Sequence, residues 1–385
     1  MVRCDALIVG GGPAGSTCAR VLRQAGWQVL VMDRARFPRD KVCAGWVTPG
    51  VFRLLDLDPS EYRATGLTIQ DITGFRTSVM GDPPIETRYG RTISYAIRRC
   101  EFDTFLLNRS GAEVLHETPL ESLERRGNEW VANGAITARV VIGAGGHFCP
   151  VSRFLAARTF TVRDVRPVVA KEAEFRLDDD ESDADGEIPE LFFCRDLEGY
   201  GWCVRKGGYL NIGLGRRENG DLNPHIHDFM AFLERNGLAR RASFVRWRGH
   251  AYLASGTGPR PLIADGVLVA GDAAGLAYPE SGEGIKPAVE SGRLAAETLV
   301  AAQGRAGIDD LKPYEAELRR RYPPAPQTPA ALAGVTKALG RRLMRSPLFT
   351  RHVVIDRWFL RNTKHEEREE YEGTKGFFEI QKRNS

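Results

Sequence analysis

The feature that most constrains this chain is a glycine turn near its amino terminus, set between two short apolar runs. Residues 6–9 and 29–32 are continuously apolar, residues 10–15 read GGGPAG, and Asp33 follows the second run. Apolar runs of this length are typical of strands buried on both faces, and a helical pattern connects them. The stretch predicts a strand, a turn that opens a helix, and a second strand ending in an acid.

Three glycines of this turn have separate roles in a nucleotide-binding unit. Gly10 permits the tight turn, Gly12 lets the backbone approach a pyrophosphate, and Gly15 lets helix and strand pack closely. The helix start adds amide donors and the positive end of a dipole. Asp33, 21 residues after Gly12, is placed to accept from a ribose hydroxyl, and it disfavours a 2′-phosphate because two negative groups would meet. We expect FAD or NAD here rather than NADP.

Length and composition set the broad class. A chain of 385 residues that is 42% hydrophobic predicts two or three domains, and its net charge of +4 is too small to indicate nucleic acid. It holds no apolar run of about 18 residues, and its first apolar segment continues into the glycine turn, so we expect a soluble, cytoplasmic protein without a secretion signal. Seven scattered cysteines without a C-x-x-C pair predict neither a zinc site nor a disulfide framework.

The rest of the chain mixes strand and helix patterns. Residues 34–50 form a polar loop too long for a simple connection, and loops of that length commonly carry function. Residues 95–109 have helical spacing, whereas residues 140–146 indicate a buried strand that ends in a glycine turn. Residues 168–175 and 202–214 each predict a strand.

Two segments, one acidic and one containing histidines, carry residue types that can bind metal ions. The acidic run at residues 178–186 imitates the first half of a calcium loop, but Phe192 stands where that loop needs a bidentate carboxylate. His225 and His227 stand two apart without a third ligand in view. We therefore expect no metal site.

A second glycine turn follows late in the chain. Residues 266–275 read as an apolar strand, the pair Gly271 and Asp272, and small residues that begin a helix; a further helical pattern covers residues 289–302. Helix starts and free amides converge in this span, which suits an extended anionic or electron-rich ring system.

The late pair, in a chain that opens with GxGxxG, resembles the FAD-binding pattern of two-domain flavoprotein oxidoreductases, which include aromatic hydroxylases, flavin halogenases and geranylgeranyl reductases. Arg99, three residues before Phe102, matches a helix-borne arginine of that superfamily. The resemblance implies an α/β fold with a Rossmann-type FAD-binding domain, a second α+β substrate domain with a mostly antiparallel sheet, and C-terminal helices. The expected bounds are 1–66, 94–160 and 256–304 for the FAD-binding domain, 67–93 and 161–255 for the substrate domain, and 305–385 for the helices.

Three local matches resemble the geranylgeranyl reductase branch. Its P-x-x-K-x-C-x-G-x-x-x-P, Y-x-W…N-V-G-x-G and T-G-E-G-I elements match Pro38, Lys41, Cys43, Gly45 and Pro49, then Tyr200, Trp202 and residues 211–215, then residues 281–285. The chain also departs from the relatives, because residues 143–146 read Gly-Ala-Gly-Gly in place of Gly-Ala-Asp-Gly. That loss disfavours a hydroxylase-like NADPH cycle, and the halogenase W-x-W-x-I-P motif is absent.

The resemblance assigns the expected binding residues. FAD contacts are expected at Gly10, Gly12, Pro13, Ala14, Gly15, Asp33, Arg34, Lys41, Cys43, Ala44, Gly45, Arg99, Gly145, Gly271, Asp272, Gly282, Gly284 and Ile285. The apolar substrate is expected to contact Trp46, Tyr200, Trp202 and Leu210.

The resemblance implies reduction of isolated C=C bonds of a prenyl, isoprenoid or similar apolar substrate by hydride transfer from reduced FAD, with NAD(P)H or ferredoxin as the external electron donor. Cys43, whose neighbours Arg39 and Lys41 favour its thiolate, is expected to donate a proton or to be a small buried side chain; Glu283 is a proton relay or a turn residue. Two other functions stay open: an FAD-dependent monooxygenase or halogenase of the same fold, and a flavin-free prenyl-binding escort protein.

The segment 341–362 combines basic residues with large apolar ones. It either lies on a membrane surface, where a prenyl substrate would be presented, or packs its apolar face onto the flavin domain.

Overall fold

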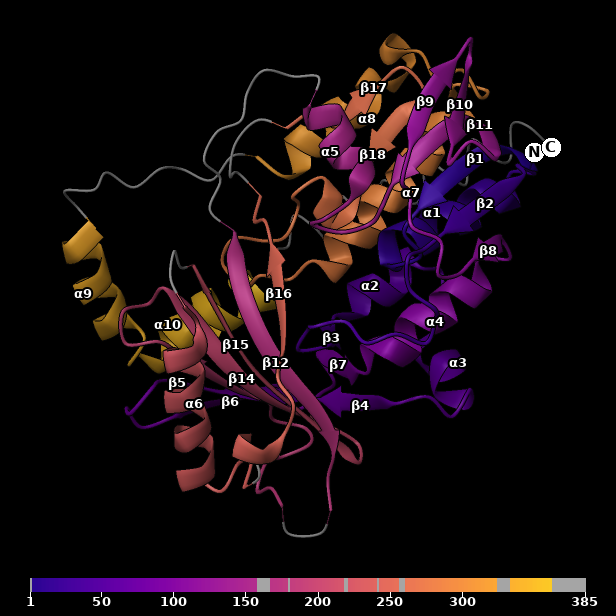
Figure 1. Cartoon of the computed structure of the whole chain (residues 1–385). Helices are drawn as coiled ribbons and strands as arrows, with labels where there is room; N and C mark the ends of the chain where they lie inside the picture. Colours follow the sequence, from indigo (N-terminus) through magenta and orange to yellow (C-terminus); the bar gives the residue numbers. More distant parts are fainter. Residues whose placement is uncertain are drawn as a thin grey trace.

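Two large sheets and a small third sheet organise the fold (Figure 1). The computed structural model describes residues 2–157, 167–178, 181–217, 221–240, 242–255, 260–323 and 333–361. Its helices are α1 (Pro13–Gln24), α2 (Pro49–Leu54), α3 (Pro59–Ala64), α4 (Arg99–Arg109), α5 (Pro150–Ala156), α6 (Asn223–Arg235), α7 (Ile285–Ala301), α8 (Ile308–Arg321), α9 (Ala333–Leu343) and α10 (Pro347–Phe349). Short 3-10 helices span Ala242–Phe244 and Gly271–Ala273, and a π-helix spans Thr350–Phe359.

The first large sheet is built on parallel strands. In spatial order they are β17 (Ile263–Ala264), β18 (Val267–Val269), β11 (Ile136–Gly143), β1 (Val2–Val9), β2 (Val29–Met32) and β8 (Glu113–Leu115). Strand β17 is antiparallel to β18, and the antiparallel pair β9 (Leu123–Arg126) and β10 (Glu129–Ala132) joins the start of β11. Side chains of α1, α7 and α8 pack into its core, which explains why β1 and β2 are almost continuously apolar.

The second large sheet is mostly antiparallel and lies at the lower left of Figure 1. Its order is β16 (Arg248–Tyr252), β12 (Val168–Arg176), β15 (Tyr209–Arg217), β14 (Gly199–Lys206), β13 (Glu190–Phe193), β5 (Gly74–Val79) and β6 (Ile85–Arg88). Only the β13–β5 pair is parallel among its described pairs. Helix α6 covers one face through Phe229 and Leu233.

A small antiparallel sheet stands between the two large ones. It consists of β3 (Trp46–Val47), β7 (Ser94–Ile97) and β4 (Ile69–Ile72). Its residues share a buried cluster with Phe52 of α2, Phe102 of α4 and Val289 of α7. This cluster holds the loop that leads into β3 against α2, α4 and α7.

The π-helix packs on the second sheet. Val354, Ile355 and Phe359 share a buried cluster with Phe75 and Phe193. The expectation that the C-terminal segment covers the flavin domain is therefore wrong, since its apolar face meets the other sheet. Residue 362, the last of the predicted segment, lies outside the described residues.

Two predicted elements differ from the structure. The helical pattern at residues 95–109 divides into β7, which ends at Ile97, and α4, which begins at Arg99, because the first residues pair in the small sheet. The single strand predicted at residues 202–214 is a hairpin, β14 and β15, that turns at Gly207, where φ is +58°. A Gly-Gly pair is a turn signal that the strand reading passed over.

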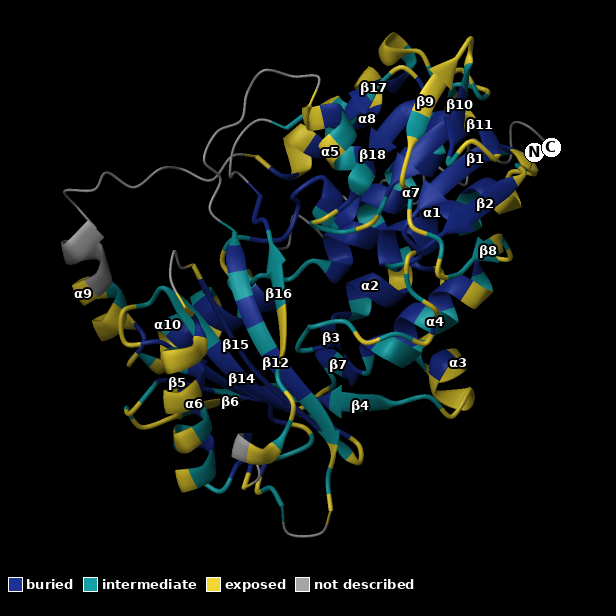
Figure 2. Ribbon diagram, in the orientation of Figure 1, coloured by how far each residue is buried: buried dark blue, intermediate teal, exposed yellow. Residues whose placement is uncertain are grey.

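Most residues in the strands of the two large sheets are buried, and they are coloured dark blue in Figure 2. No helix in the described ranges is long and apolar enough to cross a membrane. Among the same residues, no group of three or more His, Cys, Asp or Glu side chains is arranged to hold a metal ion. His225 and His227 lie in the first turn of α6. All seven cysteines are free thiols.

Candidate active site

A cavity of about 460 Å³ lies where the early glycine turn, the late glycine turn, the Cys43 loop and the second sheet meet. The first sheet contributes the two turns, and β12, β14, β15 and β16 contribute the opposite wall. Residues from position 10 to position 288 therefore converge on one space. Its volume is within the usual range for ligand pockets, about 300–1,000 Å³.

The early turn places backbone amides at the cavity. Gly12 caps α1, Pro13 takes its first position, and the Ser16 amide donates to the Gly12 carbonyl at 2.9 Å. Gly10 has φ of +113°, and a Cβ there would overlap the Ala144 carbonyl. A Cβ on Gly15 would overlap the Gly10 carbonyl, so this glycine serves packing. The free amides at the start of α1 consequently face the cavity.

Asp33 fixes the shape of the turn from the end of β2. Its Oδ2 accepts from the Gly11 amide at 2.8 Å, and its Oδ1 accepts from the Ala35 amide at 2.9 Å. The carboxylate is only 9% exposed and lines the cavity. Each oxygen keeps a further lone pair, so the group can also accept from a ligand hydroxyl.

The late turn meets the early one directly. Gly271 has φ of +63°, and the site of its missing Cβ lies 3.1 Å from the Ala14 Cβ. Ser291 of α7 accepts from the Gly271 amide at 2.9 Å. A Cβ on Gly292 would overlap the Ala14 carbonyl, so α7 and α1 approach through small residues. The two glycine turns form one continuous edge of the cavity.

Two arginines, Arg39 and Arg99, form the next part of the wall, and the buried Asp103 holds them from behind. Arg99 holds Asp103 with two hydrogen bonds of 2.8 and 2.9 Å, and Arg39 reaches the same carboxylate at 3.2 Å. Despite the effect of burial, these arginines keep the pKa of Asp103 below its ordinary value. The Arg39 Nη1 is buried and has no hydrogen-bond partner among the described residues, and its Nη2 lies 3.3 Å from the missing Cβ of Gly12.

Lys41 is a second cation beside the late turn. Its Nζ lies 4.0 Å from Asp272 Oδ2 and contacts His250 Nε2. Burial lowers the pKa of Lys41 to about 8, and Asp272 opposes this shift. Burial and the nearby Lys41 lower the pKa of His250 to about 3, so its imidazole is neutral. Of Lys41 and His250, Lys41 is therefore the one whose charge changes near neutral pH.

Cys43 lies in a turn that contacts both halves of the molecule. The Cys43 amide donates to Glu172 Oε2 at 2.6 Å, and the Gly45 amide donates to Cys43 Sγ at 3.3 Å. Gly45 has φ of +70°, and a Cβ there would overlap Lys206 Nζ and the Ile97 carbonyl. The thiol is partly exposed and lines the cavity.

Aromatic side chains form the far wall of the cavity. Trp46, Tyr200 and Trp202 line it, and Phe359 of the π-helix lies behind the first two at ring distances of 5.7 and 5.4 Å. The Trp202 Nε1 donates to Asn211 Oδ1 at 2.7 Å, so its polar atom is satisfied. Such edge and tilted ring contacts are favourable, and they make a rigid apolar surface.

Glu283 stands at the start of α7. Its Oε1 accepts from the Lys286 amide at 2.9 Å, which satisfies one of the free amides of that helix start. Burial raises the pKa of Glu283 to about 7, against the effect of the Lys286 amide. The side chain lines the cavity, so its position fits both the turn role and the proton-relay role expected from the sequence.

Most of the residues selected from the sequence line this cavity. They are Gly10, Gly12, Pro13, Ala14, Asp33, Arg34, Lys41, Cys43, Ala44, Gly45, Trp46, Arg99, Gly145, Tyr200, Trp202, Gly271, Asp272, Gly282, Glu283, Gly284 and Ile285. Gly15 is not in the lining because it packs α1 onto the turn.

Leu210 does not line the cavity. It is fully buried beneath α6, together with Phe229. In the β14–β15 register Leu210 pairs with Arg205, whereas Trp202 pairs with Gly213, so the two side chains point to opposite faces of the sheet. The expectation of a substrate contact at Leu210 is not supported.

Several lining residues were not selected from the sequence for a binding role. They are Arg39, His147, Phe148, Arg248, His250 and Tyr252, among others. Arg39 was noted only as a neighbour of Cys43, although a cation so close to a glycine turn is itself a signal. Strand β16 carries His250 and Tyr252, and its short, polar sequence gave no strand signal.

The residues present fit a bound FAD. The amides at the start of α1 and the buried, unpartnered Nη1 of Arg39 suit a pyrophosphate, and Asp33 suits a ribose. The late turn, with Gly271 and Gly284, leaves a strip of backbone without side chains for a flat ring.

Comparisons with known proteins agree with this fit. A family model described as an FAD binding domain matches residues 3–155. The digeranylgeranylglycerophospholipid reductase of Methanothrix thermoacetophila is 31% identical, with 83% of each chain covered. The geranylgeranyl diphosphate reductase of Rhodobacter capsulatus is 30% identical, with 81% of this chain and 78% of the relative covered.

Solved structures share the fold. A geranylgeranyl bacteriochlorophyll reductase-like protein of Thermoplasma acidophilum matches with a TM-score of 0.70 at 20% identity, over 89% of this chain and 88% of that one. Halogenase PltM, solved in complex with FAD, matches with a TM-score of 0.67 at 17% identity, over 90% of this chain and 78% of that one. The expected fold class, FAD as cofactor and an oxidoreductase activity are confirmed, and the flavin-free alternative is removed.

Proposed function

Because this chain belongs to the geranylgeranyl reductase family of FAD-binding oxidoreductases, we propose that it reduces isolated C=C bonds of a prenyl chain. The observation that carries the proposal is the continuity of the cavity: the aromatic wall of Trp46, Tyr200 and Trp202 and the two glycine turns line the same space. An apolar chain lying on that wall would reach the flavin end without leaving the protein. A long apolar substrate is the class that such a wall accommodates.

Saturating a C=C bond adds a hydride to one carbon and a proton to the other. When bound, reduced FAD supplies the hydride. The chain must therefore position the alkene, exclude water and deliver the proton. The aromatic wall serves the first two tasks, because its rings are packed and Phe359 backs them.

Two groups of the chain are candidates for the proton. Glu283 has a pKa raised to about 7 by burial, so a large fraction carries a proton at neutral pH. Cys43 presents a thiol to the same cavity. We assign the proton to one of these two side chains and the flavin contacts to the lining residues of the two glycine turns. NAD(P)H or ferredoxin then returns electrons to the flavin.

An anaerobic reoxidation experiment tests this function. Photoreduced, flavin-loaded protein is mixed with geranylgeranyl diphosphate or with a digeranylgeranyl glycerophospholipid, and the oxidised flavin absorbance is followed while products are identified by mass spectrometry. We expect reoxidation together with a product heavier by two hydrogens per bond. Absence of reoxidation with every polyprenyl compound would contradict the proposal.

Variants distinguish the two proton donors. Glu283→Gln and Cys43→Ser each keep side-chain size, and the one that removes the donor lowers the reoxidation rate by about 100-fold or more. Cys100→Ser is the matched control, because Cys100 is the other partly exposed thiol and lies outside the main cavity lining.

A monooxygenase or halogenase activity is the alternative. The fold alone permits it, since halogenase PltM shares it. Substrate-stimulated oxygen uptake with NAD(P)H would support it. Gly145 lines the cavity at the position where the hydroxylases carry an aspartate, and that difference disfavours it.

A further inference from the structure

The Cys43 turn is held from the second sheet by a cluster of buried polar side chains. Glu172 on β12 accepts from the Cys43 amide at 2.6 Å, and Asn211 on β15 reaches the Cys43 carbonyl at 3.4 Å. Asn211 also donates to Glu172 Oε2 at 3.3 Å and to Glu174 Oε2 at 3.2 Å. The backbone amide and carbonyl of Cys43 therefore both contact the second sheet. Glu172 lies 129 residues after Cys43 in the sequence.

Glu172 differs from its neighbours in having no cation of its own. Lys206, which is fully buried, donates to Glu174 at 2.8 Å rather than to Glu172. Arg99 is occupied by Asp103. No ion pair joins Glu172 to a cation among the residues that the structure describes, and its partners are neutral donors.

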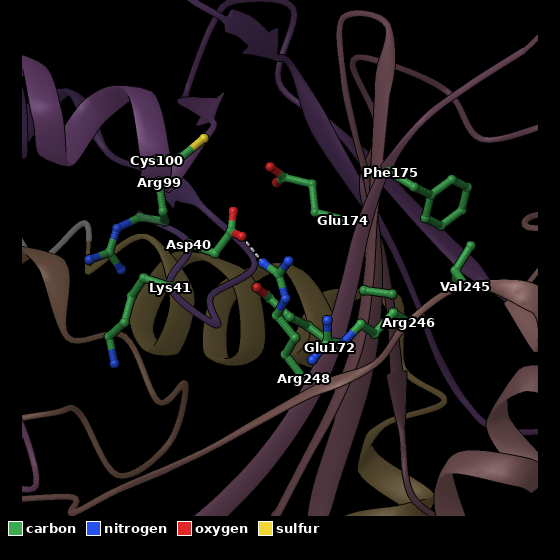
Figure 3. A pocket seen from close by; sticks show the side chains of 11 residues that line it. Asp40, Lys41, Arg99, Cys100, Glu172, Glu174, Phe175, Val245, Arg246 and Arg248 are labelled. Carbon is green, nitrogen blue, oxygen red and sulfur yellow. Dashed lines mark ion pairs between the residues drawn. The ribbon is translucent and has the colours of Figure 1, made fainter. Parts of the chain in front are cut away.

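A second, smaller cavity of about 180 Å³ brings other charges near Glu172 (Figure 3). Glu172 and Glu174 reach it from β12, and an ion pair joins Arg248 to Asp40 at its edge. The titratable and charged groups around Glu172 are Cys43, whose amide it accepts from, and Lys206 on β14 and Glu174 on its own strand, which act on its charge. Arg248 on β16, Arg246 before β16, Asp40 and Lys41 of the loop, and Arg99 and Cys100 of α4 line the same cavity as Glu172.

We propose that Glu172 is a positioning residue that holds the Cys43 turn through the Cys43 amide, and that protonation of this carboxylate loosens the turn. A carboxylate accepts from an amide about twice as strongly as a neutral group does. Loss of the charge therefore weakens the hydrogen bond that joins the Cys43 amide to the second sheet. Only the idea that the held thiol serves catalysis rests on the proposed function; the contact itself does not.

The Glu172 carboxylate is expected to change its charge near neutral pH. Burial raises the pKa of Glu172 to about 7, although Lys206, the Cys43 amide and Asn211 favour the charged form. Glu174 shows the opposite behaviour, because Lys206 and Arg98 keep its pKa below the ordinary value despite burial. The two acids share a strand and a face, and only Glu172 bonds to Cys43.

The direct test follows the Cys43 amide by NMR. Flavin-loaded protein is labelled with ¹⁵N-cysteine, and the Cys43 signal is assigned by its loss in Cys43→Ser. We expect this signal to titrate with a midpoint near pH 7 in the unaltered protein, to stay flat in Glu172→Gln, and still to titrate in Glu174→Gln, with a midpoint at lower pH because a neighbouring negative charge is removed. A flat Cys43 signal in the unaltered protein, or an unchanged titration in Glu172→Gln, would overturn the proposal.

Thiol reactivity gives the second measurement. Alkylation of Cys43 by iodoacetamide, quantified by peptide mass spectrometry in a Cys100→Ser background, should be about fivefold faster in Glu172→Gln than in the parent at high pH, since about 1 kcal/mol of restraint is lost. The two proteins should react equally below about pH 6, where Glu172 is already neutral. A ratio that does not change with pH would contradict the proposal.

Neither measurement uses a prenyl substrate. If the flavin is not reoxidised by any polyprenyl compound while the Cys43 signal titrates as expected, the function is wrong and Glu172 keeps its positioning role. If a polyprenyl compound reoxidises the flavin while the Cys43 signal does not titrate, the proposed function stands and the positioning role of Glu172 is wrong.

Discussion

The two ends of the cavity are held in place by different physical means. At the nucleotide end, Gly10 and Gly15 fit because no Cβ can be accommodated, and the contacts are between backbone atoms. At the Cys43 end, the fit depends on buried charge, carried by Glu172, Glu174 and Lys206. The early glycine turn should therefore be sensitive to one added carbon and insensitive to pH, and the Cys43 end should depend on protonation.

The largest effect is expected at Gly15. In Gly15→Ala the new Cβ would overlap the Gly10 carbonyl, so α1 and the turn must separate. We expect the unfolding free energy to fall by more than about 5 kcal/mol and the bound flavin to be lost. Urea unfolding at pH 6 and pH 8, with flavin absorbance after gel filtration, measures both.

The loss in Gly15→Ala should be equal at the two pH values. Gly208→Ala is the control, because Gly208 has open space around its missing Cβ. If Gly15→Ala were normally stable and flavin-loaded, the claim that the nucleotide end depends on the absence of a Cβ would be wrong.

Phe359 tests the apolar part of the substrate end. Its ring is fully buried against Trp46, Phe193 and Tyr200, so Phe359→Ala leaves a cavity behind the aromatic wall. We expect a loss of about 4 kcal/mol that does not vary with pH. Phe244→Ala, at a side chain that is 82% exposed, should leave the unfolding midpoint unchanged. A loss that varied with pH would show that charge and packing are coupled at this end.

Lys206 tests the charged part. Lys206→Met removes the ammonium that donates to Glu174 at 2.8 Å and leaves Arg98 as the remaining cation paired with that carboxylate. The loss should be about 3 kcal/mol at pH 8 and smaller at pH 5, because Glu172 and Glu174 both lose the nearby charge of Lys206 and can take up protons more readily. Lys312→Met, which removes an exposed ion pair with Asp309, is the control. An equal loss at both pH values would refute a charge-based fit.

Glu283, the titrating acid of the late turn, should change only how steeply stability varies with pH. Burial raises the pKa of Glu283 from 4.5 to about 7, so its protonated form favours the folded state. That stabilisation is complete below about pH 4.5 and is lost as the pH rises through about 7. Relative to the unaltered protein, Glu283→Gln should flatten the decline of unfolding free energy across this window by at most about 1.4 kcal/mol per pH unit. An identical decline in both proteins would assign the pH dependence to other groups.

The nucleotide end could be predicted from the sequence because its signals are local. The glycines, the apolar runs and Asp33 lie within residues 6–33, and each residue type has one plain physical reason to be there. The late pair, Gly271 and Asp272, was found in the same way, and the structure brings it against Ala14. The α/β fold class followed from these two segments and is confirmed. The domain boundaries stay a prediction.

The substrate end was predicted only in part, because its contacts join distant residues. Nothing in the local sequence links Glu172 to the Cys43 amide, and nothing in it indicates that Lys206, at the end of β14, is fully buried. Leu210 was misplaced for a related reason: the hairpin turn at Gly207 decides which residues of β15 face the cavity, and the sequence pattern was read as one strand.

Phe359 also has a consequence for synthesis on the ribosome. Everything that lines the nucleotide end lies before residue 289, whereas the ring that backs Trp46 and Tyr200 arrives about 70 residues later. A nascent chain therefore contains every residue that lines the FAD end of the cavity before Phe359, which packs behind Trp46 and Tyr200, has been synthesised. The packing behind the aromatic wall is therefore the last part of the described site to be synthesised.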